Sequence, residues 1–260
     1  MKVAVVQTEP IFGEVASNVK EALLLMGSAD ANIFVLPELF NTGYNFTDLR
    51  EVQLLSERSN GNTFQSIAGF AKKKSCFVVY GFVEQVGKFY NSAALVGPDG
   101  IVGLYRKVHL YNRENLFFAS GDFGFPVFEL PFGKVGIMIC FDWIYPESAR
   151  SLALGGAQLI AHPSNLVMPY CPEAMVTRCL ENRVFAATAD RIGEEERGGV
   201  KFCYIGQSEV VSPKGEILTR LGENKAGISV VDVDLSLANN KRVNEFNDLL
   251  RDRKVEQYKQ

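Results

Sequence analysis

The sequence predicts a mixed α/β domain whose β-sheets contain parallel and antiparallel strands and are covered by helices. Three observations indicate this fold class. Short apolar runs rich in β-branched residues recur along the 260 residues, helical patterns separate these runs early and midway, and Gly- and Pro-containing turns join others directly. Direct turns connect antiparallel strands, whereas helices connect parallel ones, so a purely parallel doubly wound sheet is not expected.

The expected strands are short runs in which apolar residues dominate. They cover residues 2–7, 32–36, 76–84, 89–96, 101–106, 134–140, 158–162, 184–192, 204–212, 216–221 and 227–233. The turn GPDG at 97–100 and the turn SPKG at 212–215 each link two of these runs. Hairpins are therefore expected over 77–106 and 203–233.

The expected helices are longer stretches with apolar residues at helical spacing. They cover residues 15–26, 63–74, 146–154 and 172–183. Because no linker, low-complexity segment or repeat of fixed period interrupts the pattern, we expect one domain over residues 1–260. Its last segment, 238–260, is highly polar with a few apolar residues, which is typical of a tail that is frayed or docked on a neighbour.

Composition and charge exclude several classes of protein. The chain is 47% hydrophobic and 22% charged with a net charge of −3, which gives no basic surface for nucleic acid. Its apolar runs are far shorter than the ~20 residues that cross a bilayer, and the first residues do not resemble a secretory signal. The five cysteines are scattered without a CxxC motif. A reducing, cytoplasmic location is therefore expected.

Three of the expected strands lead into a reactive side chain. NIFVLP precedes Glu38, IVGLYR precedes Lys107, and KVGIMI precedes Cys140. Ligands of α/β proteins bind beyond the carboxyl ends of strands, so these side chains are candidates for one pocket. Together they can hydrolyse a carbonyl compound, with Cys140 as nucleophile, Glu38 as proton acceptor and donor, and Lys107 as stabiliser of the oxyanion.

Each of these residues alone has an ordinary structural explanation. A cysteine at the end of an apolar strand is usually a small buried hydrophobe, and a lysine in that position is usually solvated. The context of all three residues decides between these explanations. LPELFNTGYNF, YRKVHLYNRENLFFASGD and GIMICFDWIYPESAR resemble the three catalytic blocks of the nitrilase, or carbon–nitrogen hydrolase, superfamily. The resemblance continues through HPSNLVMPYCPEAM, LENRVFAATADRIG and YIGQSEVVSPKGE and covers nearly the whole chain.

The resemblance implies a fold, an assembly and a set of residues. It assigns the family's Glu-Lys-Cys triad to Glu38, Lys107 and Cys140, and it implies a four-layer α-β-β-α sandwich that forms homodimers or larger homo-oligomers. The tail after Ala238 is then expected to dock on the partner subunit. Glu114 matches a second glutamate that bonds the lysine or positions substrate, although a loop carboxylate is the alternative. Tyr44, Phe118, Trp143 and Asn165 lie in segments that resemble the family's pocket-lining stretches, and ordinary core residues are the alternative for each. Phe141 is the last expected pocket residue, because a sharp turn after Cys140 would offer its N–H as a second oxyanion donor.

Neither a metal nor a cofactor is expected. His109 and His162 are the only histidines, and no cysteines at ligand spacing accompany them, so both are expected to be hydrogen-bonded structural residues. A papain-like pairing of Cys140 with a histidine lacks its sequence signature. Asp142, Glu147 and Arg150 fit a structural ion-pair network as well as a catalytic one. No Walker loop, GxGxxG or GxSxG motif is present.

The substrate remains open between an amide and a nitrile. CFDWIYPE is more similar to the amidase branches of the superfamily than to nitrilases, which typically have Cys-Trp-Glu, so a small carboxamide or carbamoyl amide is the first expectation. A small nitrile is the second. Arg113 and Arg191 are candidates for binding a substrate carboxylate. A non-catalytic scaffold is disfavoured by the intact triad, and an ammonia-donating module of a synthetase by the absence of a nucleotide motif.

Overall fold

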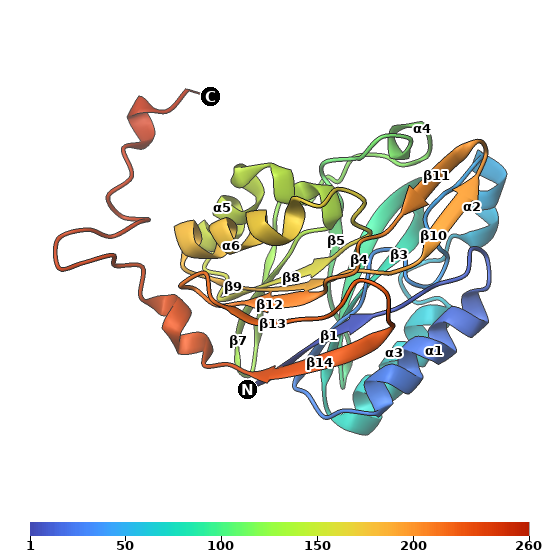
Figure 1. Cartoon of the computed structure of the whole chain (residues 1–260), viewed down its shortest axis with the longest axis horizontal. Helices are drawn as coiled ribbons and strands as arrows, with labels where there is room; N and C mark the ends of the chain where they lie inside the picture. Colours follow the sequence, from blue (N-terminus) through green and yellow to red (C-terminus); the bar gives the residue numbers. More distant parts are fainter. Residues whose placement is uncertain (260) are drawn as a thin grey trace.

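Two six-stranded mixed sheets form the centre of the molecule (Figure 1). The computed structural model describes residues 1–259. The first sheet has the strand order β14-β1-β2-β3-β4-β5 and the second has the order β13-β12-β9-β8-β7-β6. A separate two-stranded ribbon, β10-β11, stands beside them.

The strands of the first sheet come from both ends of the sequence. They are β1 (Lys2–Gln7), β2 (Ile33–Val35), β3 (Phe77–Val86), β4 (Lys88–Gly97), β5 (Gly100–Arg106) and β14 (Gly227–Asp232). β1, β2 and β3 pair in parallel, whereas β3-β4, β4-β5 and β1-β14 pair antiparallel. As a result β2 and β5 run in the same direction, and their carboxyl ends lie at the same edge of the sheet.

The second sheet is built from the middle of the chain. Its strands are β6 (Val127–Leu130), β7 (Gly133–Ile137), β8 (Leu159–Pro163), β9 (Phe185–Ala189), β12 (Glu209–Val211) and β13 (Ile217–Arg220). β7, β8 and β9 are parallel, and the outer pairs are antiparallel. The ribbon consists of β10 (Glu194–Arg197) and β11 (Val200–Cys203).

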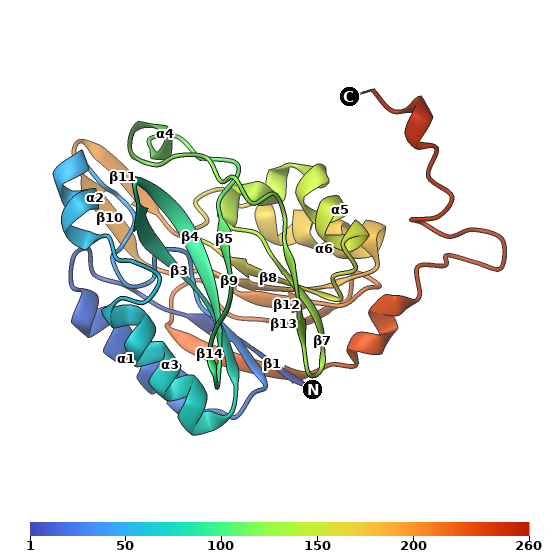
Figure 2. The same ribbon diagram turned by 180° about the vertical axis from the view of Figure 1, so that it is seen from behind.

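Helices cover the outer face of each sheet (Figures 1 and 2). The described helices are α1 (Val15–Gly27), α2 (Leu49–Leu55), α3 (Asn62–Lys74), α4 (Glu114–Phe117), α5 (Pro146–Leu154) and α6 (Cys171–Asn182), and the 3-10 turns are η1 (Cys140–Ile144), η2 (Leu235–Asn239) and η3 (Val255–Gln257). α1 and α3 pack on the first sheet, and α5 and α6 pack on the second. The expected α-β-β-α sandwich is thereby confirmed.

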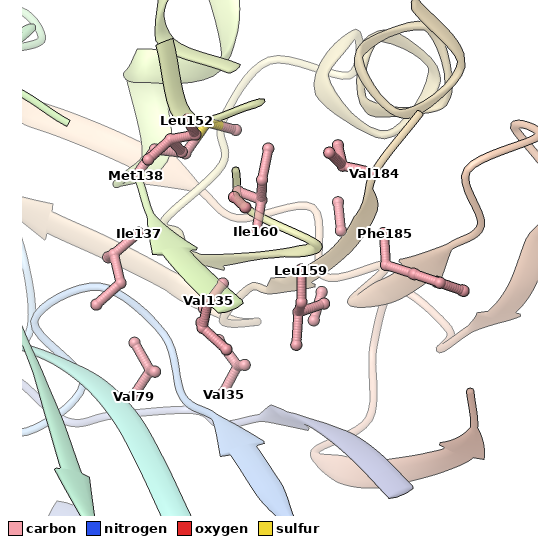
Figure 3. Close-up of a cluster of buried hydrophobic side chains, with 14 of the residues drawn as sticks. Val35, Val79, Val135, Ile137, Met138, Leu152, Leu159, Ile160, Val184 and Phe185 are labelled. Atoms are coloured by element: carbon pink, nitrogen blue, oxygen red, sulfur yellow. The ribbon is translucent and has the colours of Figure 1, made fainter. Parts of the chain in front are cut away.

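Successive apolar side chains of a strand point to opposite faces of its sheet, which explains why the two sheets pack face to face. Val3 and Val5 of β1 point into the layer between the sheets, whereas Ala4 and Val6 point toward the helices of the first sheet. Figure 3 shows the layer itself, where Val35 and Val79 meet side chains of the second sheet. Their partners there are Val135, Ile137 and Leu159. Burial of these apolar side chains is the main driving force that holds the sandwich together.

Several predicted strand boundaries are wrong. The strand predicted at 134–140 ends at Ile137, the one at 184–192 covers Phe185–Ala189, and the one at 204–212 shrinks to Glu209–Val211. The expected hairpins hold over 77–106, and the hairpin around the SPKG turn is confirmed by the antiparallel pairing of β12 with β13. The expected pairing of β13 with β14 is wrong, because these strands belong to different sheets. An apolar run marks buried backbone, and it continues where the chain has already left the sheet.

Elements that lack an apolar pattern were not predicted. α4 is a single turn, and β10 and β11 come from the charged segment EEERGGVKFC, which forms ion pairs and packs only Val200 and Phe202 against an apolar cluster. α2 and β6 were missed as well. Of the residues that the structure describes, no helix combines the length and apolar character that crossing a membrane requires.

Candidate active site

Glu38 lies just beyond β2, where the chain passes very close to β3. The Gly81 N–H donates to the Pro37 carbonyl (3.2 Å), and a Cβ added at Gly81 would lie 2.6 Å from the Cα of Glu38. Only glycine permits this approach. Leu39 follows with a positive φ of 46°. The backbone is therefore bent sharply at Glu38, and the side chain of Glu38 is fully buried.

Lys107 follows β5 and is held by neighbouring backbone on both sides. Its N–H donates to the Asn91 carbonyl of β4 (2.8 Å), and its carbonyl accepts from the Gly121 N–H (2.8 Å). The Lys107 side chain is fully buried. It is thus fixed at the same edge of the first sheet as Glu38, and the expected meeting of these two strand ends is observed.

One ammonium group holds two carboxylates at this edge. Lys107 Nζ donates to Glu38 Oε1 (2.7 Å) and to Glu114 Oε1 (2.6 Å). Asn91 Nδ2 also donates to Glu38 Oε1 (2.7 Å), and the Tyr44 hydroxyl donates to Glu114 Oε1 (2.6 Å). Each carboxylate is therefore held through its Oε1 atom, whereas its Oε2 atom makes no hydrogen bond.

Burial and mutual charge shift the ionisation of this cluster. Burial raises the pKa of Glu38 to about 7, although Lys107 opposes the shift; the nearby Glu114 adds to it. Burial alone would lower the pKa of Lys107, but Glu114 and Glu38 outweigh burial and raise it. Lys107 thus stays cationic, while Glu38 can gain or lose a proton near neutral pH.

Cys140 comes from the other sheet and lies on a sharp turn. It follows β7, begins the 3-10 turn η1, and has a positive φ of 41°. Non-glycine residues seldom adopt this conformation, which is concentrated at functional sites. The Cys140 thiol is 3.7 Å from the Asn165 carbonyl of the loop after β8. Burial raises the pKa of this thiol, as does Glu38, while Lys107 opposes the shift.

His162 supports the backbone of this turn and does not act on the thiol. Its Nε2 lies 2.9 Å from the Cys140 carbonyl, which only accepts, so Nε2 carries the proton. Burial lowers the pKa of His162 to about 4, so the ring is neutral. The geometry excludes a papain-like pair of His162 with the Cys140 sulfur, and the expectation of a hydrogen-bonded structural histidine is confirmed.

Asp142 ties the nucleophile turn to the segment after Lys107. Its Oδ2 accepts from the Tyr105 hydroxyl (2.6 Å) and the Ile139 N–H (2.9 Å). Its Oδ1 accepts from the His109 N–H (3.1 Å) and His109 Nδ1 (2.8 Å). Asp142 is fully buried and both of its carboxylate oxygens accept hydrogen bonds from the protein, so its role is structural. His109 in turn stacks on Tyr145, with ring centroids 3.8 Å apart.

Some of the buried polar atoms without a hydrogen-bond partner belong to the triad and to residues beside it. Within residues 1–259, Glu38 Oε2, Glu114 Oε2 and both amide atoms of Asn165 make no hydrogen bond. Asn91 Oδ1 and Asp190 Oδ2 are likewise without a partner. Folded proteins rarely leave such atoms unpaired, because each one costs free energy. Those of Glu38 and Glu114 belong to the two carboxylates that Lys107 holds, where a polar ligand can bond them.

Aromatic side chains and one cation enclose a small cavity beside Glu114. Its lining consists of Tyr44, Asn45, Phe46, Arg113, Glu114, Phe117, Phe118 and Phe202. The structure thus brings Tyr44 and Phe118, both predicted to line the pocket, to this cavity. Trp143 instead packs in the core between sheet and helices, and Phe141 contacts Tyr111 with ring centroids 5.0 Å apart.

The two arginines considered from the sequence differ in their surroundings. Arg191 is 1% exposed and fully engaged, because it pairs with Glu195, donates to the Pro10 carbonyl (2.9 Å) and lies over the Tyr204 ring. Its Nε donates to the Ile192 carbonyl as well, so each of its three nitrogens bonds a protein acceptor, which indicates a structural residue. Arg113 is half-buried on the cavity wall.

Sequence reasoning missed four residues of this site. Asn91 bonds Glu38, Asp190 accepts from the Leu166 N–H (2.8 Å), and Phe46 and Phe202 line the cavity. A signal existed for Asn91, since a lone amide inside the apolar strand FYNSAALV is unusual. No group of three or more His, Cys, Asp or Glu side chains in residues 1–259 is arranged to hold a metal ion.

Comparison with known proteins agrees over nearly the whole chain. A family model described as carbon-nitrogen hydrolase matches residues 2–242. A protein named nitrilase from Pyrococcus abyssi is 49% identical, with 99% of each chain covered. The carbon-nitrogen hydrolase from Helicobacter pylori G27 has a TM-score of 0.87 at 26% identity, covering 99% of this chain and 96% of that one. A mutant amidase from Nesterenkonia sp. AN1, with acrylamide added at its active site cysteine, has a TM-score of 0.81 at 25% identity, covering 98% and 97%.

Proposed function

The chain belongs to the carbon-nitrogen hydrolase family, and we propose that it hydrolyses the carboxamide group of a small molecule to a carboxylic acid and ammonia. Cys140 is the nucleophile, Glu38 carries the proton, Lys107 stabilises negative charge, and Glu114 positions the substrate. The arrangement of one thiol, one ammonium group and two carboxylates in a buried site supports these roles.

Acylation begins with attack of the Cys140 sulfur on the amide carbon. The raised pKa of the thiol keeps it protonated at rest, so the proton must leave as the bond to carbon forms. Glu38 Oε2 has no other partner and accepts this proton. The amide oxygen becomes an oxyanion, which Lys107 and the Phe141 N–H stabilise.

Collapse of this intermediate breaks the carbon–nitrogen bond. Glu38 returns its proton to the nitrogen, ammonia leaves, and the acyl group stays on Cys140 as a thioester. Glu38 then takes a proton from a water molecule that attacks the thioester, and the departing sulfur is reprotonated. A pKa near 7 suits both steps, because the same group must accept and donate a proton in each cycle.

The free acceptors around Cys140 are the observation that favours an amide. Glu38 Oε2, Glu114 Oε2 and Asn165 Oδ1 are buried acceptors without donors. A primary amide brings two N–H donors on its nitrogen, whereas a nitrile brings none. A nitrile would leave these acceptors desolvated and unpaired, and sites built to bond an N–H reject analogues that lack it.

Nitrile hydrolysis is the second candidate, favoured by the name of the relative from Pyrococcus abyssi. The same thiol can attack a nitrile carbon, so the two activities must be separated by substrate. We expect purified protein to release acid and ammonia from acetamide, propionamide and butyramide with a higher kcat/KM than from the corresponding nitriles. A preference for the nitriles would identify a nitrilase, and no turnover of either series would leave a non-catalytic scaffold. Ammonia release that survives in Cys140→Ala would come from a contaminant.

The proposal extends to the assembly and location of the protein. Lys241 Nζ donates to the Asn182 and Arg183 carbonyls at the end of α6 (3.1 and 2.8 Å), which anchors the start of the tail 238–260. Beyond this anchor the described tail runs away from the sandwich (Figures 1 and 2) and exposes Val243 and Phe246. These exposed apolar side chains support a homodimer in which the tail docks on a partner, and the five free cysteines support a reducing cytoplasm.

Light scattering of the full chain, compared with a truncation after Lys241, tests the assembly. We expect a dimer for the full chain and a shift toward monomer for the truncated one. A full chain that stays monomeric at micromolar concentration would exclude this role of the tail.

A further inference from the structure

Asp190 is a buried carboxyl group that holds the loop between β8 and α6. It directly follows β9, and its side chain is fully buried. Its Oδ1 accepts from the Leu166 N–H (2.8 Å), and the Leu166 carbonyl accepts from the Ile205 N–H (3.0 Å). Hydrogen bonds therefore fix the loop on both sides of Leu166, and one of them comes from a side chain.

The peptide group that Asp190 holds is the one that contacts the nucleophile. The Leu166 N–H and the Asn165 carbonyl belong to one planar peptide unit, so a bond to the N–H also orients the carbonyl. The Asn165 carbonyl accepts from the Cys140 thiol, with 3.7 Å between oxygen and sulfur. Asp190 is therefore connected to the thiol through a single peptide group.

The backbone of Asp190 is itself tied to the first sheet. Ser208 Oγ accepts from the Asp190 N–H (2.9 Å), and the Ser208 N–H donates to Gln7 Oε1 (3.0 Å). Gln7 ends β1, and its Nε2 donates to the carbonyls of Gly222 (2.6 Å) and Lys225 (2.9 Å). Gln7, Ser208 and Asp190 are all fully buried. A continuous set of buried hydrogen bonds thus runs from the first sheet through Asp190 to the loop beside the thiol.

No cation balances the Asp190 carboxyl group within residues 1–259. Arg191 is the adjacent cation, but its three nitrogens bond the Ile192 carbonyl, Glu195 and the Pro10 carbonyl. Asp190 Oδ2 has no hydrogen-bond partner at all. A buried carboxylate without a cation is costly, because it loses its hydration and gains no compensating charge. The protonated, neutral acid is therefore the form that fits these surroundings.

The ionisable groups around Asp190 favour the same form. Burial raises the pKa of Asp190 well above its usual range; neighbouring backbone N–H groups and Arg191 oppose the shift, and Glu38 adds to it. The other ionisable group nearby is the thiol of Cys171 at the start of α6, which is neutral because burial raises its pKa. A neutral Asp190 adds no second negative charge beside Glu38.

We propose that Asp190 is a positioning residue that acts as a neutral acid and orients the peptide group whose carbonyl holds the resting Cys140 thiol. This inference rests on the proposed amide hydrolysis and adds a residue that acts only through another one. Asparagine has the shape of the neutral acid and keeps the acceptor oxygen. Alanine instead leaves the Leu166 N–H buried without an acceptor.

Two substitutions at Asp190 separate positioning from charge. Asp190→Ala should lower kcat on propionamide by about tenfold to a hundredfold, because a small displacement of the sulfur misaligns its attack. Asp190→Asn should stay within about threefold of wild type. In Asp190→Asn the acid limb of the pH profile should also stay near 7, since a neutral acid has no charge to remove. An ionised Asp190 would raise the pKa of Glu38, so its removal would move that limb to lower pH.

A matched control separates positioning from a general loss of stability. Gln158 also uses a side-chain oxygen to accept a backbone N–H, that of Lys134 (2.8 Å). It precedes β8 at the amino end of the strand, whereas the loop that Asp190 holds follows the carboxyl end. Gln158→Ala and Asp190→Ala should both lower the melting temperature, but only Asp190→Ala should slow turnover.

Alkylation by iodoacetamide tests the inference independently of turnover, because it reports the accessibility and orientation of the Cys140 sulfur. Asp190→Ala should lower the rate constant of alkylation by about tenfold, whereas Asp190→Asn and Gln158→Ala should leave it unchanged. Should Asp190→Ala fail to fold, Ser208→Ala loosens the Asp190 backbone and should slow alkylation by a smaller factor.

Failure of wild type to hydrolyse any amide would refute the proposed function and leave the alkylation result standing. A wild-type alkylation rate in folded Asp190→Ala, or in Ser208→Ala where that variant replaces it, would overturn the positioning role. An acid limb displaced to lower pH in Asp190→Asn would show that Asp190 is ionised and would overturn its role as a neutral acid.

Discussion

Replacing Glu114 with glutamine removes one negative charge from the buried cluster while preserving its shape. Glu114 Oε1 accepts from Lys107 Nζ and the Tyr44 hydroxyl, each at 2.6 Å, and the glutamine oxygen can keep both bonds. The glutamine nitrogen takes the place of Oε2, which has no partner. An acceptor for the substrate N–H thus becomes a donor, which is the smallest change that tests the positioning role.

The structure sets the size and direction of the expected effects. A hydrogen bond to a charged group contributes about 1.5–3 kcal/mol, so kcat/KM for an amide should fall by roughly 10- to 150-fold. Glu114 also raises the pKa values of Glu38 and Cys140 through its charge. Removing that charge should lower both values. The acid limb of the pH profile, which reports deprotonation of Glu38 near 7 in wild type, should then move to lower pH.

Steady-state kinetics from pH 5 to 9 measures the first two effects, and thiol modification measures the third. Methyl methanethiosulfonate carries no amide, so its reaction with Cys140 does not depend on substrate positioning. We expect Glu114→Gln to react with it at least as fast as wild type, because the thiol pKa falls. Wild-type kcat/KM together with an unmoved acid limb would show that Glu114 is a loop carboxylate without a role in turnover.

Four other changes have defined outcomes. Cys140→Ala should lower kcat by about 10⁴-fold or more and end inactivation by iodoacetamide. Lys107→Arg should nearly abolish turnover, because a site with Nζ 2.7 and 2.6 Å from two buried carboxylates has no room for a planar guanidinium group; near wild-type kcat would contradict this. Asp142→Asn replaces a carboxylate oxygen that accepts hydrogen bonds with an NH₂ group that cannot accept them, so buried donors lose their partner. The free energy of unfolding in urea should fall by about 1–3 kcal/mol, whereas the exposed control Glu147→Gln should leave it unchanged. Glu38→Gln should abolish turnover at every pH but raise the melting temperature above pH 7. An ionised Glu38 is disfavoured in the fold, so the stability that the neutral acid contributes is present below its ordinary pKa and lost as pH rises through about 7.

The sequence predicted the triad because each member ends a readable strand. Apolar runs before Glu38, Lys107 and Cys140 mark buried strands, and the reactive side chains follow at once. Their common edge was expected from the rule on carboxyl ends of strands. In the structure two strands separate β2 from β5, and Cys140 comes from the opposite sheet. Both features depend on strand pairings between segments that are distant in sequence. No local pattern encodes those pairings.

Other parts of the site lie beyond local patterns altogether. α4 has four residues, too few for a helical period, yet it carries Glu114 to Lys107. The ribbon β10-β11 is mostly polar, and it is attached by contacts with segments far away in sequence, such as the ion pair of Arg197 with Glu51 and the packing of Phe202 on Tyr44. Trp143 lies in a segment that resembles a pocket-lining stretch, with the core as the alternative, and in the structure its side chain belongs to a buried apolar cluster.

The features that destabilise the folded protein lie in the active site, whereas the apolar packing that stabilises it lies between the sheets. Glu38 and Lys107 are fully buried, Cys140 has a strained backbone, and several polar atoms around them lack partners, each of which opposes folding. The layer between the sheets contains almost only aliphatic side chains and offsets these terms (Figure 3). A substrate that supplies the missing hydrogen bonds would remove part of the cost on binding. The unpaired polar atoms that destabilise the free protein would therefore also provide the proposed preference for an amide.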